Sequence, residues 1–351
     1  RQAAAVGTHD RGGLFGRQCR PRHLRSRIGH ALSDPGIATG MLTTAQQRDR
    51  LIGVLCAIAT LMVWSGFILL ARLGVRTTMA PPDLIALRFA IAGSVMLPWL
   101  LRRGLGGLSW PRAIVLALLA GPGFAAPAFY GFVHAPAVHG AALMPGTLPL
   151  WTVVLAALVV GEKITTTKLL GIILTLAGIA VISFPDFLAP DSRGMSGDLL
   201  FPAASLSWAS YTVLARRWGV APLQSAAIVF VLSGLICVPA YLAVWGPRVL
   251  SAPPIDLLVQ GIYQGLIATI ASIMLFMRAV RTLGAGPTTL VTAAVPGVVA
   301  IVGIPMLGEW PSWLTAAGIL LVSAGVVVTV RGAIRAGVVP TRAAQPLPPS
   351  R

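Results

Sequence analysis

The chain has 351 residues, of which 56% are apolar and 11% are charged, with a mean hydropathy of +0.82 and a formal charge of +17. Soluble domains carry about 25% charged residues, so this composition excludes an ordinary soluble globular protein. The positive charge does not indicate nucleic-acid binding, because the basic residues stand between long apolar runs or near the chain ends. Most of the protein is therefore expected to face lipid.

Residues 1–50 are predicted to form a disordered cytoplasmic segment. The first 40 contain seven Arg and no apolar run long enough to cross a bilayer. Met41 lies ten residues before the first hydrophobic run. We therefore expect Met41 to be the natural start and residues 1–40 to come from a reading frame that was extended too far upstream. A transit peptide, which is also rich in Arg and poor in acidic residues, is the alternative.

Ten apolar runs follow, and each is long enough for a transmembrane helix, since about 20 residues span ~30 Å of hydrocarbon. We predict helices at 51–72, 83–101, 113–133, 137–160, 168–184, 197–215, 223–245, 257–280, 287–307 and 313–330. Residues 331–351 are expected to form a disordered cytoplasmic tail. The predicted fold class is an all-α polytopic membrane protein.

The distribution of Lys and Arg orients these helices. If the N-terminus is cytoplasmic, the cytoplasmic segments carry 22 Lys and Arg and the outer loops carry four. Cytoplasmic loops of membrane proteins are enriched in basic residues. Both chain ends are therefore expected on the cytoplasmic side of the membrane.

The chain contains one five-helix pattern twice. Groups of residues recur in order at spacings of 144, 141 and 147: Gly53, Trp64 and Arg72 as Gly197, Trp208 and Arg216; Phe89 and Gly93 as Phe230 and Gly234; Pro149, Glu162, Gly171 and Gly178 as Pro296, Glu309, Gly318 and Gly325. Because five is odd, the second copy crosses the membrane in the opposite sense. The prediction is two inverted repeats, 51–184 and 197–330, an arrangement typical of transporters with a substrate site between the halves.

These motifs resemble the EamA-type members of the drug/metabolite transporter superfamily. The matching segments are Pro149 through Gly161-Glu162-Lys163, Pro296 through Gly308-Glu309, Leu87-Arg88-Phe89, and Tyr263-Gln264-Gly265. The resemblance covers residues 51 to 330. It implies an inner-membrane carrier that exports metabolites or drugs, often by using the proton gradient.

Symmetry also selects candidate site residues, because a substrate is rarely symmetric. Polar residues with apolar repeat partners are better candidates, and Arg88, which aligns with Val229, is the sharpest of them. A charge inside a helix must face a cavity or a partner, or reach the interface by snorkelling, and both interpretations stay open. The predicted substrate-binding residues are Trp64, Arg88, Tyr130, Thr147, Trp151, Trp208, Tyr211, Tyr263 and Gln264.

Other repeated residues suggest packing, hinges and energy coupling. Glycines seven residues apart, as at Gly171 and Gly178, predict a close helix contact. Pro149 and Pro296 are predicted to kink their helices, either as gating hinges or as fixed bends. Three residues are candidates for coupling, with a structural role as the alternative: His139, Glu162 and Glu309.

The sequence therefore predicts a secondary active transporter that exports a small organic metabolite, an amino acid or derivative, or a drug by alternating access. The expected partners are a small-molecule substrate and the lipid bilayer, with no nucleic acid and no cofactor; coupling to protons stays open. Three scattered cysteines give no metal cluster. A passive channel or facilitator is the second interpretation. An intramembrane enzyme is the third interpretation and ranks below the others, because no catalytic motif is found in the sequence.

Overall fold

The structure, a computed structural model, describes residues 44–160, 165–188 and 193–335. Within these ranges the backbone is helical, with short connections and no strand, which confirms the predicted all-α fold. Apart from the first residue of the first helix, the described elements belong to one unit that begins at Ala45. The prediction for Glu162 falls outside the described residues.

The elements of the first half follow the predicted spans, with one interruption. They are α1 (Thr44–Thr77), α2 (Pro81–Arg103), α3 (Trp110–Ala120), α4 (Pro122–His134), α5 (Ala137–Val160) and α6 (Thr166–Leu188). The third predicted span is divided between α3 and α4 at Gly121, because Pro122 cannot donate the hydrogen bond that would continue α3.

The second half contains more interruptions. Its elements are α7 (Arg193–Arg217), α8 (Pro222–Trp245), the short 3-10 helix η1 (Arg248–Ser251), α9 (Pro254–Ile262), the π-helical segment η2 (Tyr263–Ala271), α10 (Ser272–Leu283), α11 (Ala285–Thr292), α12 (Val295–Leu307) and α13 (Trp313–Arg335). The eighth span is thus α9, η2 and α10 in sequence. The ninth is broken just before Pro296, whereas α5 continues through Pro149.

Two chain segments predicted to be disordered are partly helical. α1 begins at Thr44, so residues 44–50 form its first turns, and α13 extends through residues 331–335. Both extensions are polar at their ends, and Gln, Arg and Ala favour helices, so each transmembrane helix continues beyond the apolar run that predicted it.

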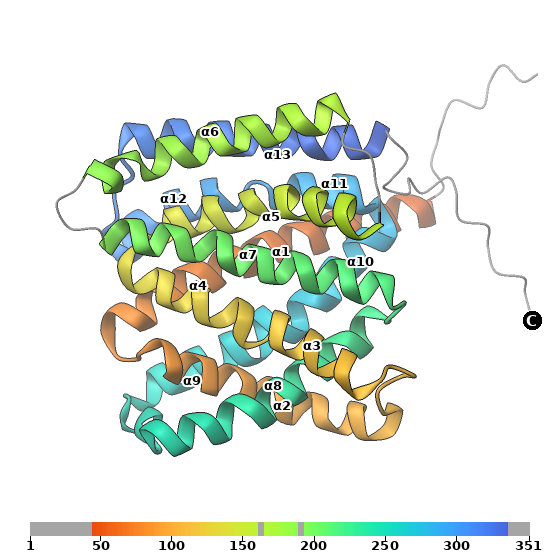
Figure 1. Ribbon diagram of the computed structural model, residues 1–351, viewed down its shortest axis with the longest axis vertical. Coiled ribbons are helices and arrows are strands. Elements are labelled where there is room, and N and C mark those ends of the chain that lie inside the picture. Colours follow the sequence, from red (N-terminus) through yellow and green to blue (C-terminus); the bar gives the residue numbers. More distant parts are fainter. Residues whose placement is uncertain (1–43, 161–164, 189–192, 336–351) are drawn as a thin grey trace, which may run out of the picture. The chain divides into compact units, whose positions relative to one another are not determined.

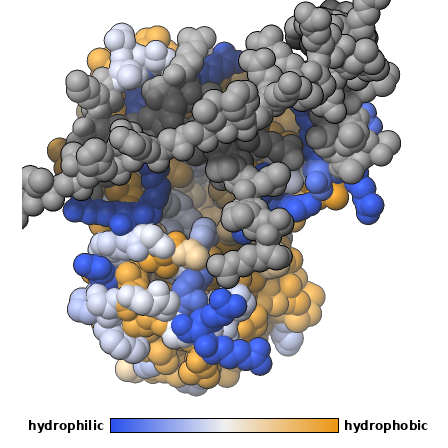
Figure 2. Space-filling model, turned by 90° about the vertical axis from the view of Figure 1, so that its right-hand side faces the viewer, coloured by the Kyte–Doolittle hydropathy of each residue, from blue (hydrophilic) through white to orange (hydrophobic). Residues whose placement is uncertain are grey.

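Nine helices within the described ranges are long and apolar enough to cross a membrane. The tenth, α7, also has 25 residues but carries Asp198 and several Ser and Thr side chains. It packs against α3, α4 and α5, and its residues Asp198 and Ser205 are buried. Elsewhere large apolar side chains point outward, and Figure 2 shows broad apolar areas on the visible described surface. The chain is a multi-pass membrane protein.

Repeat partners meet where α2 crosses α8. A Cβ atom at Gly93 would lie 2.9 Å from the carbonyl oxygen of Phe230, and one at Gly234 would lie 2.9 Å from that of Phe89. Gly93 and Gly234 are repeat partners, as are Phe89 and Phe230. The contact is therefore the same on both sides, as an inverted repeat requires at its symmetry axis.

The same reciprocal contact is found between α6 and α13, which lie side by side (Figure 1). A Cβ atom at Gly178 would lie 2.8 Å from the carbonyl oxygen of Gly318, and one at Gly318 would lie 2.8 Å from that of Gly178. Gly171 and Gly325 repeat this arrangement, at 2.8 and 2.7 Å. The predicted glycine contact is confirmed, and it joins the two repeats.

Candidate functional site

Arg88 lies on α2 and its side chain is buried, with 7% of the residue exposed. Its Nη1 donates a hydrogen bond to Oε1 of Gln264 at 3.3 Å, and its Cζ lies 5.2 Å from the centre of the Phe67 ring. The guanidinium thus contacts α1 through a cation–π interaction and η2 through a hydrogen bond. It joins an element of the first repeat to one of the second.

Polar side chains continue from Gln264 toward α1. Nε2 of Gln264 donates to Oε1 of Gln260 at 3.4 Å, and Nε2 of Gln260 donates to the carbonyl oxygen of Leu70 at 2.7 Å. The Tyr263 hydroxyl donates to the carbonyl oxygen of Val63 at 3.1 Å. These bonds hold the π-helical segment against α1, and π-helical turns are frequent at functional sites.

A continuous series of aromatic rings starts at Arg88. We call it the aromatic row: Phe67, Phe124, Trp208 and Tyr211. Its successive ring centres are 6.2, 5.2 and 5.2 Å apart. The row runs from α1 through α4 to α7, so it brings the predicted residues Trp208 and Tyr211 into one assembly with Arg88. Trp64 lies on α1 as well and stacks on Phe276 at 5.5 Å.

The other predicted substrate-binding residues lie elsewhere. Thr147 is buried but donates its hydroxyl to Leu143 within α5. Nε1 of Trp151 donates to the carbonyl oxygen of Pro202 at 3.0 Å, which ties α5 to α7. Tyr130 is 41% exposed on α4. The structure places none of these three in contact with Arg88.

His139 belongs to a second polar cluster, in which His139 and Asp198 are buried. Its Nδ1 lies 2.9 Å from Oδ1 of Asp198 and 3.6 Å from Oδ2 of Asp186, and Ser183 donates to Asp198 at 2.5 Å. One ligand atom from each of the three ionisable residues lies within 4.8 Å of the others, so the set has the chemistry to hold a cation. This cluster joins the ends of α5, α6 and α7.

Glu309 is held by basic and backbone donors. Its Oε1 lies 2.7 Å from Nε of Arg72 and 3.5 Å from Nη1 of Arg76, and its Oε2 accepts from the backbone N–H of Ala137 at 2.8 Å. Arg72 also donates to the carbonyl oxygen of Phe132. Glu309 thus links α1, the start of α5 and the end of α12.

Matching polar contacts fasten α2 to α8 near both ends. In the Asp83 clasp, Asp83 Oδ1 accepts from the Tyr241 hydroxyl at 2.6 Å and from Arg248 Nη2 at 3.0 Å. In the Gln224 clasp, Gln224 Oε1 accepts from Trp99 at 3.2 Å, and its Nε2 donates to the carbonyl oxygen of Gly104 at 2.6 Å. Asp83 and Gln224 are 141 residues apart, so the two clasps are repeat equivalents.

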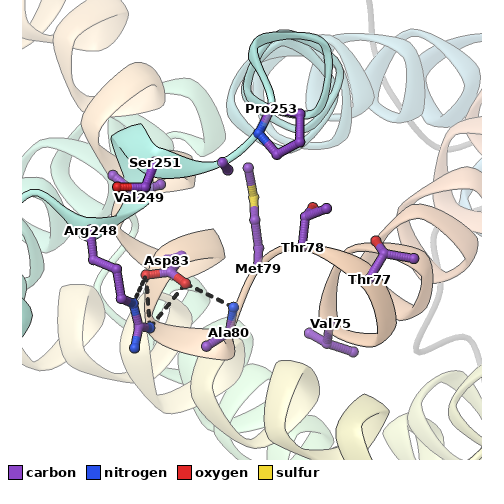
Figure 3. Close-up of a pocket in the computed structure, with 11 residues that line it drawn as sticks. Val75, Thr77, Thr78, Met79, Ala80, Asp83, Arg248, Val249, Ser251 and Pro253 are labelled. Atoms are coloured by element: carbon purple, nitrogen blue, oxygen red, sulfur yellow. Dashed lines mark hydrogen bonds and ion pairs between the residues drawn. The ribbon is translucent and has the colours of Figure 1, made fainter.

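Each clasp borders a cavity. The cavity beside Asp83 measures about 490 Å³ and that beside Gln224 about 320 Å³. Figure 3 shows Arg248 reaching from η1 to Asp83; Met79 and Pro253 also line this cavity. The hydrogen bond to Asp83 raises the pKa of Arg248 above its ordinary value. Neither cavity is lined by Arg88.

Replacing Asp83 with asparagine is expected to lower the melting temperature in detergent. The hydrogen bond from Tyr241 to a charged acceptor contributes about 1.5–3 kcal/mol. Asp256→Asn is the matched control, because Asp256 also lies in a first helical turn and no hydrogen bond is found for its side chain among the described residues. Equal melting temperatures for the two variants would show that the clasp contributes nothing.

Several site residues were not predicted, although the symmetry argument applies to them. Gln260 aligns with Ala113 and stands one helical turn before Gln264; Asp198 aligns with Val54. Phe124 carries no such signal, because an aromatic residue in an apolar run is indistinguishable from core. Its role emerges only from its contacts with Phe67 and Trp208.

Comparisons with known proteins agree with this architecture. The sequence profile of the EamA-like transporter family matches residues 51–184 and 195–331. A Bacillus subtilis protein named "Uncharacterized transporter YyaM" is 27% identical over 265 residues, covering 73% of this chain and 86% of that protein. An uncharacterized Pseudomonas aeruginosa protein is 32% identical over 174 residues, which are 47% of this chain and 56% of that protein.

A solved structure named "Crystal structure of protein" has a similar fold. It superposes with a TM-score of 0.55 at 20% sequence identity. The match covers 82% of this chain and 97% of the other. At this identity the likeness shows the fold alone.

Proposed function

The chain belongs to the EamA-like transporter family, and from this premise we propose that it is a secondary carrier that moves a small organic solute by alternating access. A metabolite, such as an amino acid or derivative, or a drug would be exported across a bacterial inner membrane. We propose that both chain ends are cytoplasmic, on the basis of the Lys and Arg distribution. Family membership itself makes the chain a membrane transporter.

The observation that carries the proposal is the contact between Arg88 and Gln264. It joins α2 of the first repeat to η2 of the second, and both side chains are buried. Their repeat partners are Val229 and Ala117, so the fold does not require polar groups there. We propose that the substrate binds beside these residues, Gln260, Tyr263, Trp64 and the aromatic row.

Other predicted residues have different proposed roles. Trp151 and Thr147 lie on α5, and we propose that they support its packing rather than touch the solute. The helix of the ninth span is interrupted just before Pro296, whereas α5 continues through Pro149, so we propose Pro296 rather than Pro149 as the hinge. Glu309, with its paired charges, is proposed as a structural clamp, and His139 with Asp198 remains a proposed site for coupling to protons.

Saturable counterflow in proteoliposomes tests the carrier. Vesicles containing the purified protein are loaded with an unlabelled solute and diluted into a trace of the labelled one. Transient accumulation of label above equilibrium is expected, because a carrier exchanges solute across the membrane. Linear, non-saturating flux without accumulation would identify a channel and contradict the proposal.

Trp64→Ala is expected to reduce counterflow at least severalfold while leaving membrane insertion intact. The substitution removes the ring that stacks on Phe276 beside the proposed site. Trp310→Ala is the control, because Trp310 is 79% exposed. If both variants transport like the wild type, the proposed position of the site is wrong.

A further inference from the structure

Arg88 carries a charge that no described carboxylate balances. The described ranges contain six acidic residues, and none pairs with Arg88. The ion pairs found for Asp83 and Glu309 are with Arg248 and with Arg72 and Arg76. A guanidinium stays protonated at physiological pH, so this buried charge is permanent.

The free edge of the guanidinium is the one that binds oxyanions. Gln264 occupies Nη1, whereas Nε is buried and has no hydrogen-bond partner among the described residues. Within the same part of the chain, no hydrogen bond is found for Nη2. Nε and Nη2 present two parallel N–H groups, which match the two oxygens of a carboxylate or a phosphate. Cζ of Arg88 lies 5.2 Å from the centre of the Phe67 ring, so an anion would approach along the Nε–Nη2 edge rather than from the side that this ring occupies.

The side chains that contact Arg88 are uncharged and do not neutralise its charge. Gln264 and Gln260 are neutral and extend the polar path to the backbone of α1. The equivalent positions of the other repeat are Val229, Ala117 and Ala113, so an apolar version of this contact also folds. An unbalanced buried charge is costly in a membrane protein and marks a functional site.

We infer that the transported solute is a small organic anion and that Arg88 makes transport an exchange of one anion for another. This inference rests on the proposed carrier function. When the anion is bound, its charge balances Arg88 while the two halves move. When the site is empty, the guanidinium must pass through the closed state unbalanced. An unbalanced charge inside a membrane helix slows that step by about a hundredfold.

Proteoliposomes of the full chain test both parts of the inference. One arm measures efflux of labelled phenylacetate into buffer with or without phenylacetate outside, and a second arm uses glycerol 3-phosphate. The neutral counterparts are phenylacetamide and glycerol. We expect an external anion to accelerate efflux by at least about tenfold in one arm, whereas neutral counterparts have no effect. The arm that responds identifies a carboxylate or a phosphate group.

Substitutions connect the result to Arg88. Arg88→Gln is expected to abolish acceleration by the external anion and preference for anions over neutral counterparts. Arg88→Lys keeps the charge but not the paired N–H groups, so anion preference is expected to persist with weaker binding. Arg102→Gln, an exposed position on the same helix, is the matched control and is expected to behave like the wild type. Size-exclusion profiles in the absence of added anion verify that the variants are folded.

The possible failures are distinct. Saturable transport in which Arg88→Gln equals the wild type, or in which neutral solutes exchange as well as anions, would overturn the inference and leave the carrier proposal standing. Saturable anion transport that runs equally fast with an empty outside would also overturn the exchange step. Absence of saturable transport in every arm and of saturable counterflow with any solute would contradict the carrier proposal itself.

Discussion

Replacing Gly178 with leucine is expected to abolish the folded protein. The first carbon of the new side chain would lie 2.7 Å from the backbone nitrogen of Val322 and 2.8 Å from the carbonyl oxygen of Gly318. Ordinary overpacking of a core costs about 1–3 kcal/mol, because side chains can move aside. Here the obstacle is the backbone of α13, so α6 and α13 must separate. Fluorescence-detected size exclusion of the protein in detergent measures the loss as disappearance of the monodisperse peak.

Gly297→Leu is the matched control. A Cβ atom at Gly297 meets nothing within 4 Å, and the residue is exposed on α12. Leucine is a better helix former than glycine by up to ~1 kcal/mol, so this variant is expected to be as stable as the wild type or slightly more stable. A folded Gly178→Leu protein with the elution profile of the control would contradict the close contact between α6 and α13.

Glu309→Ala is expected to destabilise the protein by about 3–5 kcal/mol, the cost of removing one partner from a buried ion pair. The side chains of Arg72 and Glu309 are only 12% and 14% exposed. The variant leaves Arg72 without its carboxylate and the N–H of Ala137 without its acceptor. Thermal unfolding in detergent, followed by tryptophan fluorescence, measures the change.

The double variant Arg72→Met/Glu309→Leu separates the ion pair from general disruption. Replacing both charged partners with apolar residues of similar size removes the unbalanced charge, so stability is expected to recover substantially. If Glu309→Ala were as stable as the wild type, or if the double variant were less stable than Glu309→Ala, Glu309 would not be a structural clamp.

The helical architecture and the repeat could be predicted because lipid imposes strict rules. Every backbone polar group must be satisfied within a helix, so apolar runs of about 20 residues report the spans directly. The glycine pair at Gly171 and Gly178 also predicted a contact correctly, since small residues are what allows helix backbones to approach. Gly318 and Gly325 carry the same pattern, but only the structure shows that their helix, α13, is the partner of α6.

The details of the site could not be predicted, because they depend on which helix faces meet. Asymmetry between the repeats selected Arg88 and Gln264, which do contact each other. It also selected Tyr130, which lies on the exposed face of α4. Composition and spacing do not indicate which side of a helix faces lipid when both of its sides are apolar. The π-helical segment likewise has no signature in an apolar run.

Cysteine accessibility at two repeat-equivalent connections tests the inverted arrangement most directly. Gly104 and Gly246 end α2 and α8 with positive φ angles of 56° and 64°, and an exposed serine follows each, Ser109 and Ser251. Single-cysteine variants Ser109→Cys and Ser251→Cys would be made without the native cysteines and treated with a membrane-impermeant maleimide. We expect Ser251→Cys to react in intact cells and Ser109→Cys only after the membrane is opened. Reaction of both from the same side would contradict the inverted repeat and the carrier built on it.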